Sequence, residues 1–244
     1  MIDGSTSKTP IRINKEMSNG RFCMEMIKEF IEKMPEDISA GDFCKEITGT
    51  ISHIYDSYGI DMKRLSGTPT ERITASAVIF SMFHRQIWMV GDCHCMVDGI
   101  YYDNPKQDEE KIAAMRSEYI KSELQKGVSI DSMRTKDTGR MHIVPYLIAA
   151  CSQQNTGYAV IDGFDIPMDK VRIIDIKQQN AEIILASDGY PFIKSTLKDT
   201  EEALQQLIAA DPLLIDRYKA TKGVMNGYSS FDDRSYIRFC IPGK

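Results

Sequence analysis

Four aspartates in this sequence stand at the ends of short apolar stretches, and their carboxylates could together bind divalent metal ions. The stretches are Met1-Ile2-Asp3-Gly4, Met89-Val90-Gly91-Asp92, Leu185-Ala186-Ser187-Asp188-Gly189 and Phe231-Asp232-Asp233-Arg234. Hard cations such as Mg²⁺ and Mn²⁺ prefer carboxylate and carbonyl oxygens together with water. A site for two such ions, roughly 3.5–4 Å apart, needs carboxylates that converge from different strands at one sheet edge. The pattern therefore makes a two-metal site a hypothesis to be weighed.

The same pattern also has an ordinary explanation, in which each aspartate only forms a turn or caps a helix. A lone Asp-Gly after a buried strand is typical of a turn, and we expect Gly189 to adopt positive φ there. Asp98-Gly99 and Asp162-Gly163 look the same, and we interpret both as plain turns. The pattern alone leaves the two explanations open.

Helices are predicted wherever apolar residues recur at spacings of three and four. The expected helices cover residues 15–34, 40–58 (closed by Gly59), 107–126, 142–153 and 200–220. Pro145 is expected in the first turn of the fourth helix, where a proline is tolerated. Asp211-Pro212 is expected to divide the last helix into two pieces.

Strands are predicted in two blocks and a final segment. They cover residues 74–83, 87–92 and 93–103, then 158–164, 170–176 and 181–189, and finally 235–241. The first block is a meander whose hairpin turns at Asp98-Gly99, and Met1-Ile2 resembles the end of a further strand. Because strand and helix blocks are segregated along the chain, we predict an α+β fold, a four-layer α-β-β-α sandwich of two antiparallel sheets flanked by helices.

Composition excludes several classes of protein. The chain has 244 residues, 42% of them apolar, and a net charge of −5, which does not favour nucleic acid or an anionic membrane as a partner. No apolar run approaches the ~20 residues of a membrane span, and no secretory signal opens the sequence. Six scattered cysteines match neither a disulfide scaffold nor a zinc ribbon. We expect one cytoplasmic domain over residues 1–244, and the sequence does not indicate an oligomeric state.

In order and context these stretches resemble the PPM (type 2C) family of metal-dependent protein serine/threonine phosphatases, of which the chain would be a divergent, bacterial-like member. IILASDG (183–189) is similar to the family's apolar-Ser-Asp-Gly element, and VGDCHCMVDG (90–99) to its Gly-Asp-Ser-Arg hairpin. PTERITASAVIF (69–80) and DDRSYIRF (232–239) resemble two other strands of the family more weakly. The resemblance implies a phosphomonoester hydrolase that acts on phosphorylated proteins through metal-bound hydroxide.

The resemblance also assigns roles to particular residues. Asp3 would bridge two Mn²⁺ or Mg²⁺ ions, the Gly4 carbonyl would bind one of them, and Asp188 and Asp232 would hold the other. Asp92 would help to bind a third, weaker ion. Asp3, Asp188 and Asp232 are therefore the predicted catalytic residues, and Asp233 stands where the family usually has Asn.

Several family features have no counterpart in this sequence. The family's first strand, with an acidic residue and often a phosphate-binding arginine, would precede Met1, so we expect the domain to lack it. Asp-Gly-His-Gly-Gly is replaced by Asp3-Gly4-Ser5-Thr6-Ser7, without the histidine proposed as general acid. Two alternatives therefore stay open: a catalytically impaired phosphatase-like module that binds or regulates a partner, and a metal-dependent hydrolase of small phosphate esters.

Cys93, in Gly91-Asp92-Cys93-His94-Cys95, raises the separate possibility of a thiol nucleophile or a metal site. A cysteine phosphatase needs a phosphate-binding loop that ends in arginine, and CHCMVDG has none. Along a strand Cys93 and Cys95 share one face while His94 points to the other. We therefore expect these cysteines to be small core residues.

Overall fold

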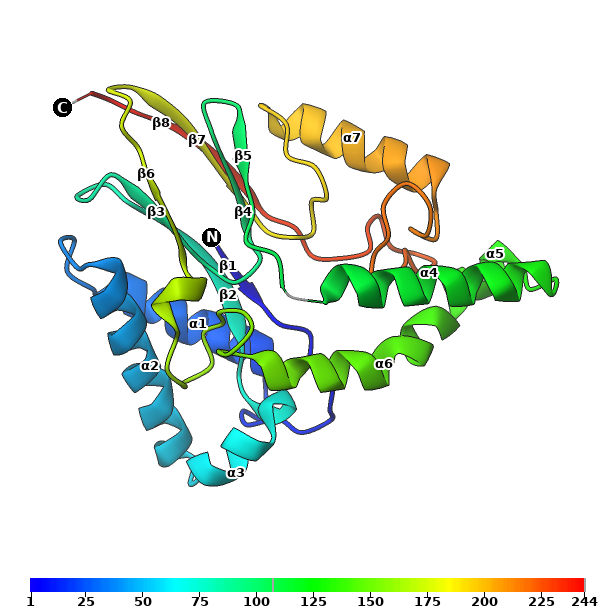
Figure 1. The fold of residues 1–244 in the computed structure, drawn as a ribbon, viewed down its shortest axis with the longest axis horizontal. Helices are drawn as coiled ribbons and strands as arrows, with labels where there is room; N and C mark the ends of the chain where they lie inside the picture. Colours follow the sequence, from blue (N-terminus) through cyan, green and yellow to red (C-terminus); the bar gives the residue numbers. More distant parts are fainter. Residues whose placement is uncertain (107, 244) are drawn as a thin grey trace.

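A computed structural model describes residues 1–106 and 108–243 of the chain (Figure 1). The strands are β1 (Ile2–Gly4), β2 (Ala75–Ser81), β3 (Gln86–Val90), β4 (His94–Val97), β5 (Ile100–Tyr102), β6 (Arg172–Asp175), β7 (Ala181–Ala186) and β8 (Tyr236–Ile241). The helices are α1 (Asn19–Ile31), α2 (Ala40–Ser57), α3 (Met62–Gly67), α4 (Glu109–Gln125), α5 (Ile130–Thr135), α6 (Thr138–Ala150) and α7 (Leu197–Ala210).

Within these described residues the strands form two four-stranded antiparallel sheets. The first has the order β1-β2-β3-β6 and the second the order β5-β4-β7-β8. The strands expected between residues 74 and 103 are present, but they form two hairpins in different sheets, β2-β3 and β4-β5, rather than one meander. The second hairpin turns, as predicted, at Asp98 and Gly99, which both have positive φ. The chain therefore crosses from the first sheet to the second in the short connection between β3 and β4.

Side chains alternate along the strands and so build the layers. Ile87 and Met89 of β3 pack between the sheets against Ile183 and Leu185 of β7, whereas Trp88 faces the helices α1 and α2. On the other side, Ile184 and Ala186 of β7 pack against Leu204 of α7. The predicted four-layer α-β-β-α sandwich is therefore confirmed, with α1 and α2 on one outer face and α7 on the other (Figure 1).

Helices α4, α5 and α6 extend beyond the sandwich, to the right in Figure 1. Arg116 of α4 is 1% exposed and bonds to Asp137, the residue that caps α6, through Nε and Nη2. Its Nη1 donates to the carbonyl oxygens of Leu213 and Ala220. One guanidinium thus joins two helices to the segment that follows α7. The short helices α3 and α5 were not expected from the sequence.

The prediction for Pro145 is wrong. Helix α6 begins at Thr138 rather than near residue 142, because the Asp137 carboxylate accepts a hydrogen bond from the backbone N–H of Arg140 and caps the helix. Pro145 consequently lies inside the helix, on its exposed side. The capping aspartate determines where this helix starts, and the proline is accommodated where water can reach the freed carbonyl.

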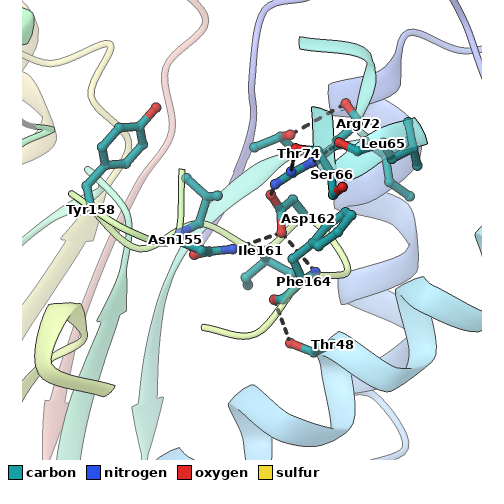
Figure 2. Close-up of polar contacts among 12 residues, drawn as sticks. Thr48, Leu65, Ser66, Arg72, Thr74, Asn155, Tyr158, Ile161, Asp162 and Phe164 are labelled. Carbon is teal, nitrogen blue, oxygen red and sulfur yellow. Dashed lines mark hydrogen bonds and ion pairs between the residues drawn. The ribbon is translucent and has the colours of Figure 1, made fainter. Parts of the chain in front are cut away.

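The strand predicted over residues 158–164 is also absent from the described fold, apart from isolated bridges. Asp162, expected in a plain turn, is instead fully buried, and its carboxylate accepts from Arg72 Nη1 at 2.8 Å and Asn155 Nδ2 at 2.8 Å (Figure 2). Gly163 does adopt positive φ, at 84°. The segment is therefore fixed by a buried ion pair rather than by a strand ladder.

The second piece of the helix predicted over residues 200–220 does not form, since α7 ends at Ala210. Pro212 disfavours helical backbone at the residue before it. The Asp211 carboxylate instead accepts from the backbone N–H groups of Ile215, Asp216 and Arg217 at 2.8–3.1 Å. These bonds hold residues 211–217 as a structured loop. Position 107, where another predicted helix was to begin, lies outside the described residues.

Across the described part of the chain, no helix combines the length and the apolar character that crossing a bilayer requires.

Candidate metal and phosphate site

The ends of β1, β3 and β7 bring three of the four predicted aspartates together. Asp3 lies in β1 opposite Ser76 of β2, and the Ser76 hydroxyl donates to Asp92 Oδ1 at 2.5 Å. Asp188 lies close enough to Asp3 for each carboxyl to shift the pKa of the other. Asp232, just before β8, is close enough for its charge to act on Asp3. We call Asp3, Asp92, Asp188 and Asp232 the acidic centre.

Two glycines allow this approach. Gly91 has a φ of 93°, and a Cβ on it would lie 2.3 Å from Ser76 Oγ, so any side chain would displace the serine that orients Asp92. Gly189 does not have positive φ, contrary to expectation. A Cβ there would lie 2.0 Å from the carbonyl oxygen of Asp233, so its role is the close contact between the β7 end and the Asp232-Asp233 loop.

Gly91→Ala is expected to lower the free energy of unfolding by about 2 kcal/mol or more, because it adds both strained φ and a steric clash. The matched control is Gly49→Ala within α2, where a Cβ meets nothing within 4 Å. That substitution should raise the stability by about 0.5–1 kcal/mol. Urea denaturation of both variants measures the difference, and equal stabilities would contradict the close approach of β2 and residue 91.

Burial and crowding of charge shift the acids of the centre. Burial raises the pKa of Asp188 well above its usual value, and the charge of Asp92 and the hydrogen bond to Asp3 add to the rise. The pKa of Asp3 is also raised, mainly by burial, with the charges of Asp92 and Asp232 contributing. Asp188 Oδ1 is buried and accepts no hydrogen bond among the described residues. Two acids that share a proton form a place where a cation is electrostatically favoured.

Asp92 has a lysine as its partner. It is 7% exposed, and the Lys106 ammonium forms an ion pair with its Oδ2. Burial opposes ionisation of Asp92, but the charge and hydrogen bond of Lys106, together with the Ser76 hydroxyl, outweigh it and lower the pKa of this carboxyl. Lys106 and Ser76 therefore favour the ionised form of Asp92.

Asp232 also pairs with a lysine, at the outer side of the centre. Lys222 Nζ lies 2.5 Å from Asp232 Oδ2, and Asp232 Oδ1 accepts from the backbone N–H of Asp233 at 2.9 Å. The Asp232 side chain is half-buried, whereas Asp233 is exposed. This contrast agrees with the choice of Asp232 over Asp233 as a candidate ligand.

The fit to a metal ion is therefore uneven. Over residues 1–106 and 108–243, no three Asp, Glu, His or Cys side chains converge as a ready-made ligand set. Asp3 and Asp188 do fit a hard cation, since their carboxyls are neighbours and Asp188 Oδ1 is buried without a hydrogen-bond partner among the described residues. Asp92 and Asp232 are held by ammonium groups instead.

The cysteines near the centre are core residues, as expected. Cys93 is 1% exposed, and burial raises the pKa of its thiol well above the usual value. A thiol that stays protonated is a poor nucleophile. His94 lies apart from the cysteines and contacts the Tyr101 hydroxyl through Nδ1 at 2.5 Å.

Three further charged residues, which belong to none of the four aspartate stretches, lie near the centre: Lys8, Glu109 and Arg140. The half-buried Lys8 and Arg140 influence one another and Glu109, the first residue of α4. Neither cation forms an ion pair with a described carboxylate within 4.0 Å. Burial lowers the pKa of Lys8 and of Arg140. Of these three residues, only Lys8 has a sequence position, four residues after Gly4, that could have suggested a place near the centre.

Comparisons with known proteins give weak similarities. No family model matches the chain, and no curated protein matches it by sequence. One similar solved structure is described as PppA, a key regulatory component of T6SS in Pseudomonas aeruginosa; it has 11% identity and a TM-score of 0.42 and covers 100% of this chain and 84% of its own. Another is the catalytic domain of the serine/threonine protein phosphatase PstP in complex with two manganese ions, with 13% identity, a TM-score of 0.33, and coverage of 77% and 69%. Since both TM-scores lie below 0.5, no assignment rests on them.

Proposed function

We propose that this chain is a metal-dependent phosphomonoester hydrolase, and that its substrates are phosphorylated proteins. The observation that carries the proposal is the pair of facing carboxyls, Asp3 and Asp188, with Asp92 beside them at the junction of two sheets. Such a cluster is unfavourable in an apolar sandwich unless protons or cations neutralise it. A cluster of carboxyls that lowers the stability of the fold is explained most simply by a functional role.

Asp3 and Asp188 would hold a Mn²⁺ or Mg²⁺ ion, with the Gly4 carbonyl and Asp232 next to them. When bound, such an ion lowers the pKa of water and neutralises charge on phosphoryl oxygens. Lys8 and Arg140 supply positive charge on the side of α4 and α6, where a phosphoryl group could be bound. They would serve in place of the family's phosphate-binding arginine.

A cleft beside Asp232 supports a polypeptide substrate. It has a volume of about 590 Å³ and is lined by Tyr190, Glu201, Tyr228, Phe231, Asp232 and Arg234, among others. Its aromatic and charged walls could contact the residues on either side of a phosphorylated side chain. A small phosphate ester would use little of this surface.

The test is a panel of phosphate esters assayed with and without Mn²⁺. We expect Mn²⁺-dependent release of phosphate from p-nitrophenyl phosphate and from phosphoserine or phosphothreonine peptides, with higher kcat/KM for peptides than for nucleotides or sugar phosphates. Asp3→Asn should abolish the metal-dependent rate while the fold, followed by circular dichroism, is retained. A higher kcat/KM for nucleotides or sugar phosphates than for peptides would instead favour a metal-dependent hydrolase of small phosphate esters.

A second candidate function is a phosphatase-like module without catalytic activity. The ion pairs of Lys106 with Asp92 and of Lys222 with Asp232 favour it, because they occupy two of the four aspartates. Such a module would bind a phosphopeptide without releasing phosphate. Binding without turnover in the same panel, unaffected by Asp3→Asn, would identify it.

A further inference from the structure

Lys106 occupies an unusual position for a lysine. It precedes α4, and its ammonium reaches Asp92 in the connection from β3 to β4. Asp188 and Glu109 are close enough for their charges to act on it as well. Lysine is a strongly hydrated point charge that normally stays in water, so its partial burial, with 25% of the side chain exposed, needs a compensating interaction. The ion pair with Asp92 supplies that interaction.

Both oxygens of Asp92 are thereby engaged. Oδ1 accepts from the Ser76 hydroxyl, and Oδ2 is paired with Lys106. A metal ion could reach Asp92 only by displacing one of these partners. Neither Asp92 Oδ2 nor Asp188 Oδ1 accepts a hydrogen bond of regular geometry from the described residues, but Asp92 Oδ2 is paired with an ammonium, whereas no cation of the described residues forms an ion pair with Asp188 within 4.0 Å. The acidic centre therefore has one carboxyl, Asp188, without a cationic partner among the described residues and another, Asp92, that already has one.

We infer that Lys106 is a built-in counter-cation of the acidic centre: its ammonium takes the position beside Asp92 that a further divalent cation would need. It thus limits the number of ions that the centre binds. The pair of Lys222 with Asp232 is similar but more exposed, as that aspartate side chain is 25% exposed against 8% for Asp92. Solvent screens the outer pair more strongly, so Lys106 is the more effective of the two.

The inference rests on the proposed function in one respect, that the centre binds divalent cations at Asp3 and Asp188. The inference goes beyond the proposed function because the Lys106 ammonium replaces the third ion that the PPM resemblance implies for Asp92. Asp92 is then a residue that positions Lys106 rather than a metal ligand.

Isothermal titration with Mn²⁺ tests this directly. Lys106→Met should bind at least one more Mn²⁺ per chain than the unmodified protein, because it frees Asp92 Oδ2. Lys106→Arg keeps the positive charge and should retain the original number of ions. Lys111→Met is the matched control, since Lys111 lies nearby in α4 and is 80% exposed, and its ion pair in the described part of the chain is with Asp108, outside the acidic centre. Electron paramagnetic resonance of bound Mn²⁺ provides a readout independent of activity.

Should Lys106→Met fail to fold, Asp92→Asn provides a second test. Asp92→Asn should leave the number of Mn²⁺ ions bound by the otherwise unmodified chain unchanged, because that carboxylate holds Lys106. Loss of a bound Mn²⁺ in Asp92→Asn would overturn the inference.

The outcomes also separate this inference from the proposed function. Equal numbers and affinities of Mn²⁺ in the unmodified protein and Lys106→Met would overturn the counter-cation and leave the hydrolase standing. Binding by Lys106→Met alone would support the counter-cation and count against the hydrolase. Binding by neither would overturn both.

Discussion

Asp188→Asn is expected to lower Mn²⁺-dependent hydrolysis of p-nitrophenyl phosphate by at least about 100-fold, which corresponds to about 3 kcal/mol of transition-state stabilisation. The reason is that Asp188 carries the buried oxygen without a hydrogen-bond partner and faces Asp3. An amide keeps the size of the side chain and loses the negative charge that would hold the cation. Initial rates at saturating Mn²⁺ measure the effect.

The same substitution is expected to stabilise the metal-free protein. Burial and the charge of Asp92 raise the folded-state pKa of Asp188 above its unfolded value. Ionisation of Asp188 therefore costs folding free energy, and stability falls as the pH rises above about 4, the unfolded pKa. Asp188→Asn removes this cost, so its melting temperature without metal should exceed that of the unmodified protein near neutral pH.

A gain in stability combined with a loss of activity would distinguish a functional carboxylate from one that only forms a turn. Asp233→Asn is the control, because Asp233 is exposed and adjacent to the centre rather than part of it. It should keep the activity within about twofold. If Asp188→Asn were as active as Asp233→Asn, the metal site would be refuted.

Much of the architecture could be predicted because it depends on local patterns. The alternation of Ile87, Trp88 and Met89 determines which side chains lie between the sheets and which face the helices. Asp98-Gly99 forms the predicted hairpin because both residues accept positive φ. The same reasoning wrongly predicted a strand over residues 158–164. Their apolar run is interrupted by Asp162, whose ion-pair partner Arg72 is 90 residues away. Periodicity contains no information on such a partner.

The candidate site shows the same division. Placing an aspartate at the end of an apolar strand is a local signal, and two of the aspartates that it selected, Asp3 and Asp188, lie near one another in the structure; their role as metal ligands stays a prediction. Lys106 was missed because it belongs to no motif and its role depends on how the segment before α4 meets Asp92. Gly189 was assigned a turn conformation, whereas its actual constraint is the carbonyl of Asp233. Close contacts between distant segments are determined by packing and could not be inferred from the sequence.

Arg72→Met is expected to lower the free energy of unfolding by about 3–5 kcal/mol, because it leaves the Asp162 carboxylate buried without its counter-ion. Arg72 Nε also donates to the Leu65 carbonyl at 3.0 Å, and its guanidinium stacks 3.7 Å from the centre of the Phe164 ring (Figure 2). The substitution therefore disconnects the loop around Asp162 from the segment between α3 and β2. Urea denaturation at constant pH gives the magnitude.

The effect of Arg72→Met should depend on pH in a direction that identifies its cause. Burial raises the pKa of Asp162 to about 6 even with Arg72 present, so protonation near pH 5 relieves the buried charge. The deficit in stability should therefore be smaller near pH 5 than near pH 8. Lys28→Met is the control, because both partners of the Lys28–Glu32 pair, at 3.9 Å, are exposed, at 58% and 60%, and its loss should cost less than about 1 kcal/mol at either pH. Equal deficits for the two variants would mean that the buried pair contributes no more than a surface one, and that hydrophobic packing alone holds residues 158–164 in place.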